Sequence, residues 1–147
     1  MPTLDDFAAL LSEEKGLVVL TTLRADHTMQ SSVVNAGVMA HPTTGERVVA
    51  LVARSGALKV ANLRARPGTT VTMRVGWQWM TVEGTASIIG PDDPAEGFDA
   101  EEVSLLLRAV FTAAGGTHSD WAEYDRVMHD DRRAAVFITP TRIYSNG

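Results

Sequence analysis

The chain contains no cysteine, and this absence removes several classes of function. Disulfide bonds, thiolate metal ligands and thiol catalysis all require a cysteine sulfur, so none of them operates within these 147 residues. Histidines are few and lie far apart, without the spacing of metal ligands: His27, His41, His118 and His129. We therefore expect no metal site, and no side chain is assigned a catalytic role.

Long apolar runs are also missing. No segment approaches the roughly 18 apolar residues of a membrane span, and the first 14 residues are acidic rather than basic and then apolar, as a signal peptide would be. We expect a cytoplasmic protein. With 147 residues, of which 45% are hydrophobic and 21% charged, the chain can build one core, so residues 1–147 are predicted to form a single domain.

Acidic side chains are absent between Arg47 and Val82, although the whole chain has a formal net charge of -5. Six of the thirteen basic side chains lie in this segment, which indicates a bound anion or, alternatively, a merely solvated surface. Nucleic acid is disfavoured as the anion, because the net charge is negative and the aromatic residues are not interleaved with the basic ones.

The middle of this segment, residues 54–63, favours a phosphate site. An apolar run precedes a Ser-Gly pair, and a helix-forming sequence follows it. A strand, a turn and a helix start bring together unpaired first-turn N–H groups and the positive end of a helix dipole. Lys59 and Asn62 would share one helix face, and Arg54 lies about one turn earlier, so the three side chains can converge.

Local patterns predict short strands with few helices between them. Strands are expected over residues 17–23, 29–39, 47–53, 69–75, 77–89 and 134–139. Helices are expected over residues 5–11, 57–64, 99–115 and 121–129. The third of these helices begins at a capping pair, Asp99 and Glu102. Tight turns between consecutive strands favour an antiparallel sheet curled into a small barrel, with helices outside. A doubly wound dinucleotide fold is disfavoured, because no Gly-x-Gly-x-x-Gly follows the first strand.

Two other features have a structural and a functional interpretation. Trp77 and Trp79 are two residues apart, so on a strand they would share one face. They could pack against a planar cofactor or line a dimer interface. His118 and Asp120 resemble a catalytic pair but have no nucleophile beside them, so we favour a cap for the helix that starts near Trp121.

The order and spacing of these segments resemble the pyridoxamine 5'-phosphate oxidase-like split β-barrel superfamily. The resemblance rests on residues 17–26, 30–34, 48–59, 62–64, 66–67, 82–86 and 116–121. Residues 118–121 and 131–133 are similar to the actinobacterial branch that uses the deazaflavin coenzyme F420 in place of FMN. The resemblance implies a mainly β (α+β) fold: an antiparallel split β-barrel of the flavin-reductase and PNP-oxidase type, with peripheral helices.

The resemblance also implies a set of cofactor-binding residues. The phosphate would be held by Val52, Ala53, Arg54, Ser55 and Lys59, with Asn62 nearby, and the ring would lie against Gln30, Ser31, Ser32 and Val33. Trp79 falls where FMN-using relatives place a polar cofactor contact, a departure that disfavours FMN. Arg64 and Arg66 are expected to contact the acidic tail of F420.

The function implied by this resemblance is hydride transfer from reduced F420 to a conjugated small molecule such as an enone, quinone or tetrapyrrole. Solvent can supply the proton. Relatives are homodimers with the cofactor between subunits, so a homodimer is expected. The alternatives are an FMN-binding oxidase or reductase of the same fold, and a non-enzymatic carrier of a flavin or haem-like molecule.

Overall fold

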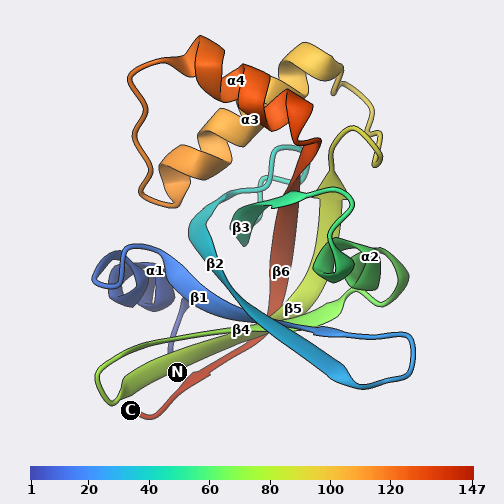
Figure 1. Cartoon of the computed structure of the whole chain (residues 1–147). Helices are drawn as coiled ribbons and strands as arrows, with labels where there is room; N and C mark the ends of the chain where they lie inside the picture. The colour runs from blue at the N-terminus through green and yellow to red at the C-terminus, as the bar shows by residue number, and fades with distance from the viewer.

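The computed structural model describes residues 1–147 as a six-stranded barrel with four helices (Figure 1). The elements are α1 (Leu4–Ser12), β1 (Leu17–Leu23), β2 (Met29–Ala40), β3 (Arg47–Arg54), α2 (Leu58–Ala65), β4 (Gly68–Val75), β5 (Gln78–Ile89), α3 (Ala100–Ala113), α4 (Trp121–Asp130) and β6 (Arg133–Ser145). The barrel closes in the order β1-β2-β3-β6-β5-β4, with every pairing antiparallel. The predicted fold class is confirmed. None of the helices is both long and apolar enough to cross a membrane.

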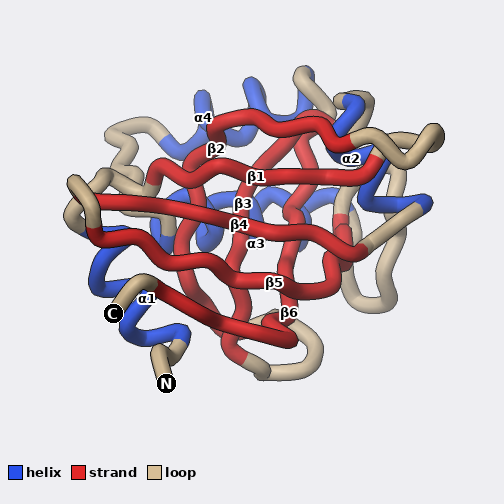
Figure 2. Tube along the Cα trace, turned by 90° about the horizontal axis from the view of Figure 1, so that it is seen from below, coloured by secondary structure: helices blue, strands red, loops and turns tan.

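The hairpin of β1 and β2 forms because buried and outward-facing residues alternate along β1 and because one residue of the connecting turn adopts a positive φ. Val18 and Leu20 are buried inside the barrel, whereas Leu17 and Val19 lie on its outer face. His27 in the connecting turn has a φ of 67°. Figure 2, seen from below, shows β1, β4 and β5 side by side across this face of the barrel.

Two apolar cores lie on the two faces of β3 and β6. The first fills the barrel and is closed by Phe7 of α1 and Leu63 of α2. The second lies under α3 and α4, where Val110 packs with Phe137. Because both faces are covered, residues 48–51 and 134–138 are all buried, which explains their continuous apolar sequence.

The last strand is longer than predicted, because β6 continues past Thr139 to Ser145. Pro140 cannot donate a ladder hydrogen bond, and it lies opposite Gly84 where the register of β5 and β6 shifts. A Cβ at Gly84 would lie 2.3 Å from the Thr139 carbonyl oxygen, so glycine allows this close approach. The fifth strand also starts one residue later than predicted, which leaves Trp77 in the preceding turn.

Candidate functional site

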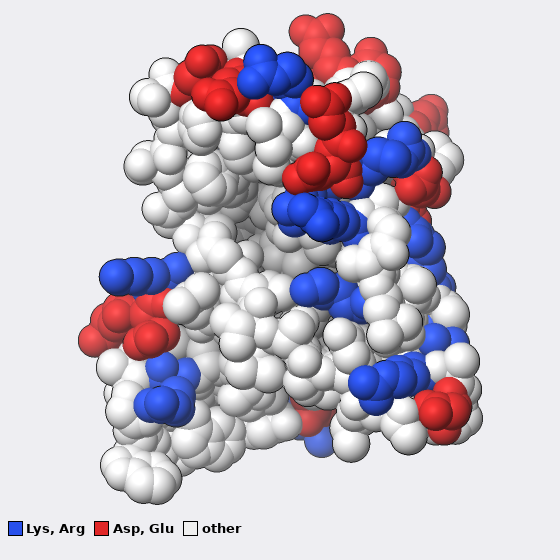
Figure 3. All heavy atoms as spheres, viewed as in Figure 1, with Lys and Arg blue, Asp and Glu red and all other residues white.

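A groove of about 510 Å³ lies between the end of β3, the start of α2, strand β2 and the helices α3 and α4. In Figure 3 a hollow lies below the region of these two helices, with basic side chains along its right-hand side. The charged residues of the lining are all cationic, and ten of its fourteen members are hydrophobic. The lining consists of Val33, Val34, Asn35, Val52, Ala53, Arg54, Ala57, Lys59, Val110, Phe111, Ala114, Tyr124, Met128 and Arg133.

The basic end of the groove forms where four elements meet. Arg54 ends β3 and lies directly opposite Arg133, the first residue of β6. Lys59 is in the first turn of α2, and its Nζ donates a hydrogen bond of 3.2 Å to Ser32 Oγ on β2. The pairing of β3 with β6 and the close approach of α2 to β2 therefore bring three cations together.

The N-terminus of α2 lacks a side-chain cap at this end of the groove. The other helices begin with side chains that accept a first-turn hydrogen bond, namely Thr3 for α1, Asp99 for α3 and Asp120 for α4. Helix α2 begins after Ala57, whose side chain cannot accept one. In the first turn, the Val60 N–H is bonded to the Ala57 carbonyl oxygen, whereas the N–H groups of Leu58 and Lys59 stay available for an anionic ligand.

The opposite wall of the groove is apolar and is formed by Val110, Phe111, Tyr124 and Met128. The rings of Phe111 and Tyr124 stack with centroids 5.0 Å apart. The Tyr124 hydroxyl donates to the Leu107 carbonyl oxygen at 3.1 Å, and burial raises the pKa of Tyr124 to about 12. The phenol is thus neutral at physiological pH and already hydrogen-bonded, and the wall offers an apolar surface to a ring.

Close backbone contacts hold this wall against β2. Asn35 Nδ2 donates to the Lys15 carbonyl oxygen at 2.8 Å and to the Ala114 carbonyl oxygen at 3.2 Å. A Cβ at Gly37 would lie 2.1 Å from the Ala113 carbonyl oxygen, so only glycine lets α3 approach so closely. These contacts fix the end of α3 beside the groove.

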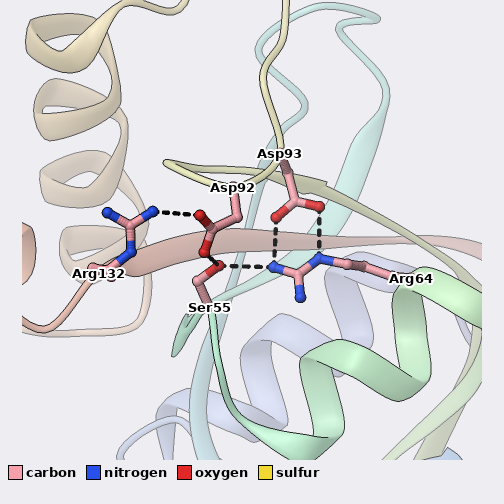
Figure 4. Close-up of polar contacts among 5 residues, drawn as sticks. All are labelled: Ser55, Arg64, Asp92, Asp93 and Arg132. Carbon is pink, nitrogen blue, oxygen red and sulfur yellow. Dashed lines mark hydrogen bonds and ion pairs between the residues drawn. The ribbon is translucent and has the colours of Figure 1, made fainter.

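The turn between β3 and α2 is tied to the linker that follows β5 (Figure 4). Ser55 Oγ donates to Asp92 Oδ2 at 2.5 Å and accepts from Arg64 Nη2 at 2.7 Å. Arg64 also binds both carboxylate oxygens of Asp93, at 2.7 and 2.8 Å, and Arg132 pairs with Asp92. The hydrogen bond from Ser55, and then that from Arg132, hold the pKa of Asp92 below its usual value.

Five of the predicted cofactor-binding residues line the groove: Val33, Val52, Ala53, Arg54 and Lys59. A sixth, Ser32, is next to it through its hydrogen bond with Lys59. Residues proposed from two separate segments, the phosphate turn and the second strand, therefore meet at one place. The sequence analysis predicted these residues, but it did not predict the apolar wall that lies opposite them.

The structure does not bring the other predicted residues to the groove. Ser55 is only 1% exposed, and its hydroxyl is hydrogen-bonded to Asp92 and Arg64. Asn62 is 2% exposed and donates to Thr22 Oγ1 at 3.0 Å beneath α2. Gln30 accepts a hydrogen bond from Thr22, while Ser31 and Thr21 share one across the hairpin.

Trp79 and the two expected tail-binding cations also lie elsewhere. The Trp79 ring packs edge-on against Tyr144 beside a different groove. Arg64 is paired with Asp93, and Arg66 Nε donates to the Leu23 carbonyl oxygen at 2.8 Å. The structure therefore gives both arginines partners within the protein, which sequence reasoning did not foresee. Asp120 caps α4, as predicted.

Sequence reasoning missed Arg133 as a member of the site. It lies outside the acid-free segment and closely follows two acids, Asp130 and Asp131, so no local excess of positive charge marks it. The available signal was the basic pair Arg132 and Arg133 at the start of an apolar strand. Its place opposite Arg54 depends on the register of β3 with β6.

A second, apolar groove of about 540 Å³ lies on the outer face of β1, β2 and β4. Leu17, Val19, Val33 and Trp77 contribute to it and are 43%, 41%, 65% and 93% exposed. Val33 lines both this groove and the cationic one. The apolar outer surface is therefore continuous with the candidate site.

The closed antiparallel barrel with its peripheral helices is the split β-barrel fold of pyridoxamine 5'-phosphate oxidase-like proteins, so the predicted resemblance is confirmed at the level of fold. No family model matches the chain.

Solved structures with this fold share little sequence with the chain. A conserved hypothetical protein from Mycobacterium tuberculosis aligns with a TM-score of 0.68 and 17% identity, over 99% of this chain and 84% of that one. An F420 reductase aligns with a TM-score of 0.64 and 16% identity, over 92% and 94%. A pyridoxamine 5'-phosphate oxidase-related, FMN-binding protein from Nostoc punctiforme aligns with a TM-score of 0.65 and 11% identity, over 99% and 84%.

Proposed function

We propose that the cationic groove binds a phosphate-bearing flavin or deazaflavin and that the protein is a cytoplasmic oxidoreductase. The observation that carries this proposal is the division of the groove into two ends. Three cations and an uncapped helix N-terminus form one end, and an apolar wall forms the other. A phosphate fits the first and a planar ring fits the second. Arg133, which also lines the groove, has a buried Nε–H without an acceptor.

The finer proposal is that the cofactor is F420 and that the protein reduces a conjugated acceptor. It is supported by the resemblance of residues 118–121 and 131–133 to the F420-using branch and by an F420 reductase among the structures of similar fold. A bound reduced deazaflavin supplies a hydride. Arg54 and Lys59 would hold the phosphate, while Phe111 and Met128 exclude water from the ring. The apolar wall contains no free proton donor, so we assign the proton to solvent.

We further propose that the protein is a homodimer, with a second copy covering the apolar outer groove. Leu17, Val19 and Val33 lie on the outer face of the barrel, where a strand exposed to solvent usually carries polar side chains. Because Val33 lines both grooves, a second copy bound at the outer groove would reach the edge of the cofactor groove. The partner would thereby shield the ring from solvent.

Parallel titration of the purified, cofactor-free protein with F420 and FMN tests the function. We expect tighter binding of F420, and oxidation of reduced F420 by at least one member of a panel of enones, quinones and tetrapyrroles. Tighter binding of FMN would support the FMN-dependent alternative, and binding without turnover would support a carrier. Failure of both ligands to bind would overturn the proposal.

A further inference from the structure

We propose that Arg133 is a direct ligand of the cofactor phosphate and forms, with Arg54, a two-guanidinium clamp across β3 and β6. This inference rests on the proposed function, because the phosphate is that of the flavin or deazaflavin. It adds a residue from the last strand to the phosphate-binding part of the site, which the sequence analysis places between residues 52 and 62.

The two arginines face each other without enough negative charge between them. Arg54 and Arg133 are directly opposite in the ladder, where like charges repel. Both approach the same oxygen, Asp131 Oδ2, at 3.9 and 3.4 Å. With Lys59, three cations therefore surround the groove end and one carboxylate is near them. A phosphate would supply the charge that Asp131 alone does not.

Arg133 also has an unused hydrogen-bond donor. Its Nη2 contacts Asp131 at the long distance of 3.4 Å, while its Nε is the one buried side-chain nitrogen or oxygen in the chain without a partner. Leaving a buried donor unpaired is unfavourable. A guanidinium binds phosphate through two parallel N–H groups, so a phosphate that draws the Arg133 side chain toward the groove would give this donor an acceptor.

The clamp implies that Asp131 competes with the ligand. Its carboxylate attracts both guanidinium groups away from a bound phosphate, and it is not part of the groove lining. Removing the charge of Arg133 should weaken phosphate binding, whereas removing the charge of Asp131 should strengthen it. A residue that only maintains the fold would not produce this pair of opposite effects.

The experiment compares two variants on ligands with and without phosphate. Dissociation constants are measured for F420 and FMN, and for the phosphate-free forms of each, the deazaflavin precursor and riboflavin. Arg133→Gln should weaken the phosphorylated ligands by about tenfold or more and leave the others within about twofold. Asp131→Asn should tighten the phosphorylated ligands by about two- to fivefold. Arg126→Gln, an exposed arginine of α4 near Glu123, is the matched control.

Circular dichroism and thermal melting of each variant establish that it is folded. Equal losses on phosphorylated and phosphate-free ligands, or weaker phosphate binding in Asp131→Asn, would overturn the clamp while the proposed function stands. Inorganic phosphate is titrated as an independent probe. If no flavin or deazaflavin binds, but phosphate binds in a manner that requires Arg133, the two arginines form a phosphate site and the proposed function fails. If wild-type protein binds neither, both fail.

Discussion

Lys59 is the residue that tests the basic end of the groove with least disturbance to the fold. Its hydrogen bond to Ser32 is at the edge of the groove, so little structure depends on it. Lys59→Ala should weaken binding of a phosphorylated cofactor by about 1.5–3 kcal/mol, because a charge-assisted contact is lost. Isothermal titration measures this change, and added salt should weaken the wild type more than the variant.

Lys15→Ala is the control for this substitution, since Lys15 is the other lysine of the chain and does not line the groove. An unchanged dissociation constant for Lys59→Ala would remove Lys59 from the site. By contrast, substitution of Arg64 is a poor test of ligand binding. It would leave the Asp93 carboxylate without its arginine partner and would remove one of the two hydrogen bonds of the buried Ser55 hydroxyl, and so affect stability and binding together.

At the scale of elements, the apolar wall depends on the packing of α4 against α3. Arg108 on α3 donates to Asp125 on α4 through Nε at 2.9 Å and also through Nη2, and these contacts hold the pKa of Asp125 below its usual value. A carboxylate with a lowered folded-state pKa stabilises the protein above its unfolded value of about 3.9. That stabilisation is lost as the pH falls through the folded-state pKa.

We therefore expect Asp125→Asn to lower the melting temperature at pH 7 by a few degrees, and the difference from wild type to shrink below about pH 4. Thermal unfolding followed by circular dichroism at several pH values measures both effects. Asp130→Asn is the matched control, because Asp130 is an exposed acid of the same helix. A difference between Asp125→Asn and wild type that persists unchanged at pH 3 would contradict this account.

For the whole molecule, the proposed homodimer can be tested at the exposed apolar face of the barrel. A dimer would have twice the mass of the 15.8 kDa chain, which analytical ultracentrifugation distinguishes from a monomer. Val19→Lys places a charge within the outer groove and should give monomers. Because Val33 joins the two grooves, cofactor affinity should fall as well.

Leu105→Lys is the control for this variant, since Leu105 is a comparably exposed apolar residue on α3, outside both grooves. It should leave mass and cofactor affinity unchanged. A wild-type chain that sediments as a monomer would contradict the proposed dimer.

Local sequence patterns were enough to predict the strands, the helices and one side of the candidate groove. Strands such as β1 were predictable because alternation and turn residues are local properties, and Arg54 and Lys59 were predictable because they lie on one short strand-turn-helix segment. The barrel class followed from the order of these elements.

The set of distant side chains that share the groove depends on how the chain folds in three dimensions. The place of Arg133 opposite Arg54 depends on the register of β3 with β6, and the apolar wall depends on how α3 docks at Gly37. Ser55 carried the right chemistry for a phosphate ligand, but the folded chain brings Asp92 to its hydroxyl. These outcomes depend on contacts between segments far apart in the chain, and local patterns in the sequence carry no record of such contacts.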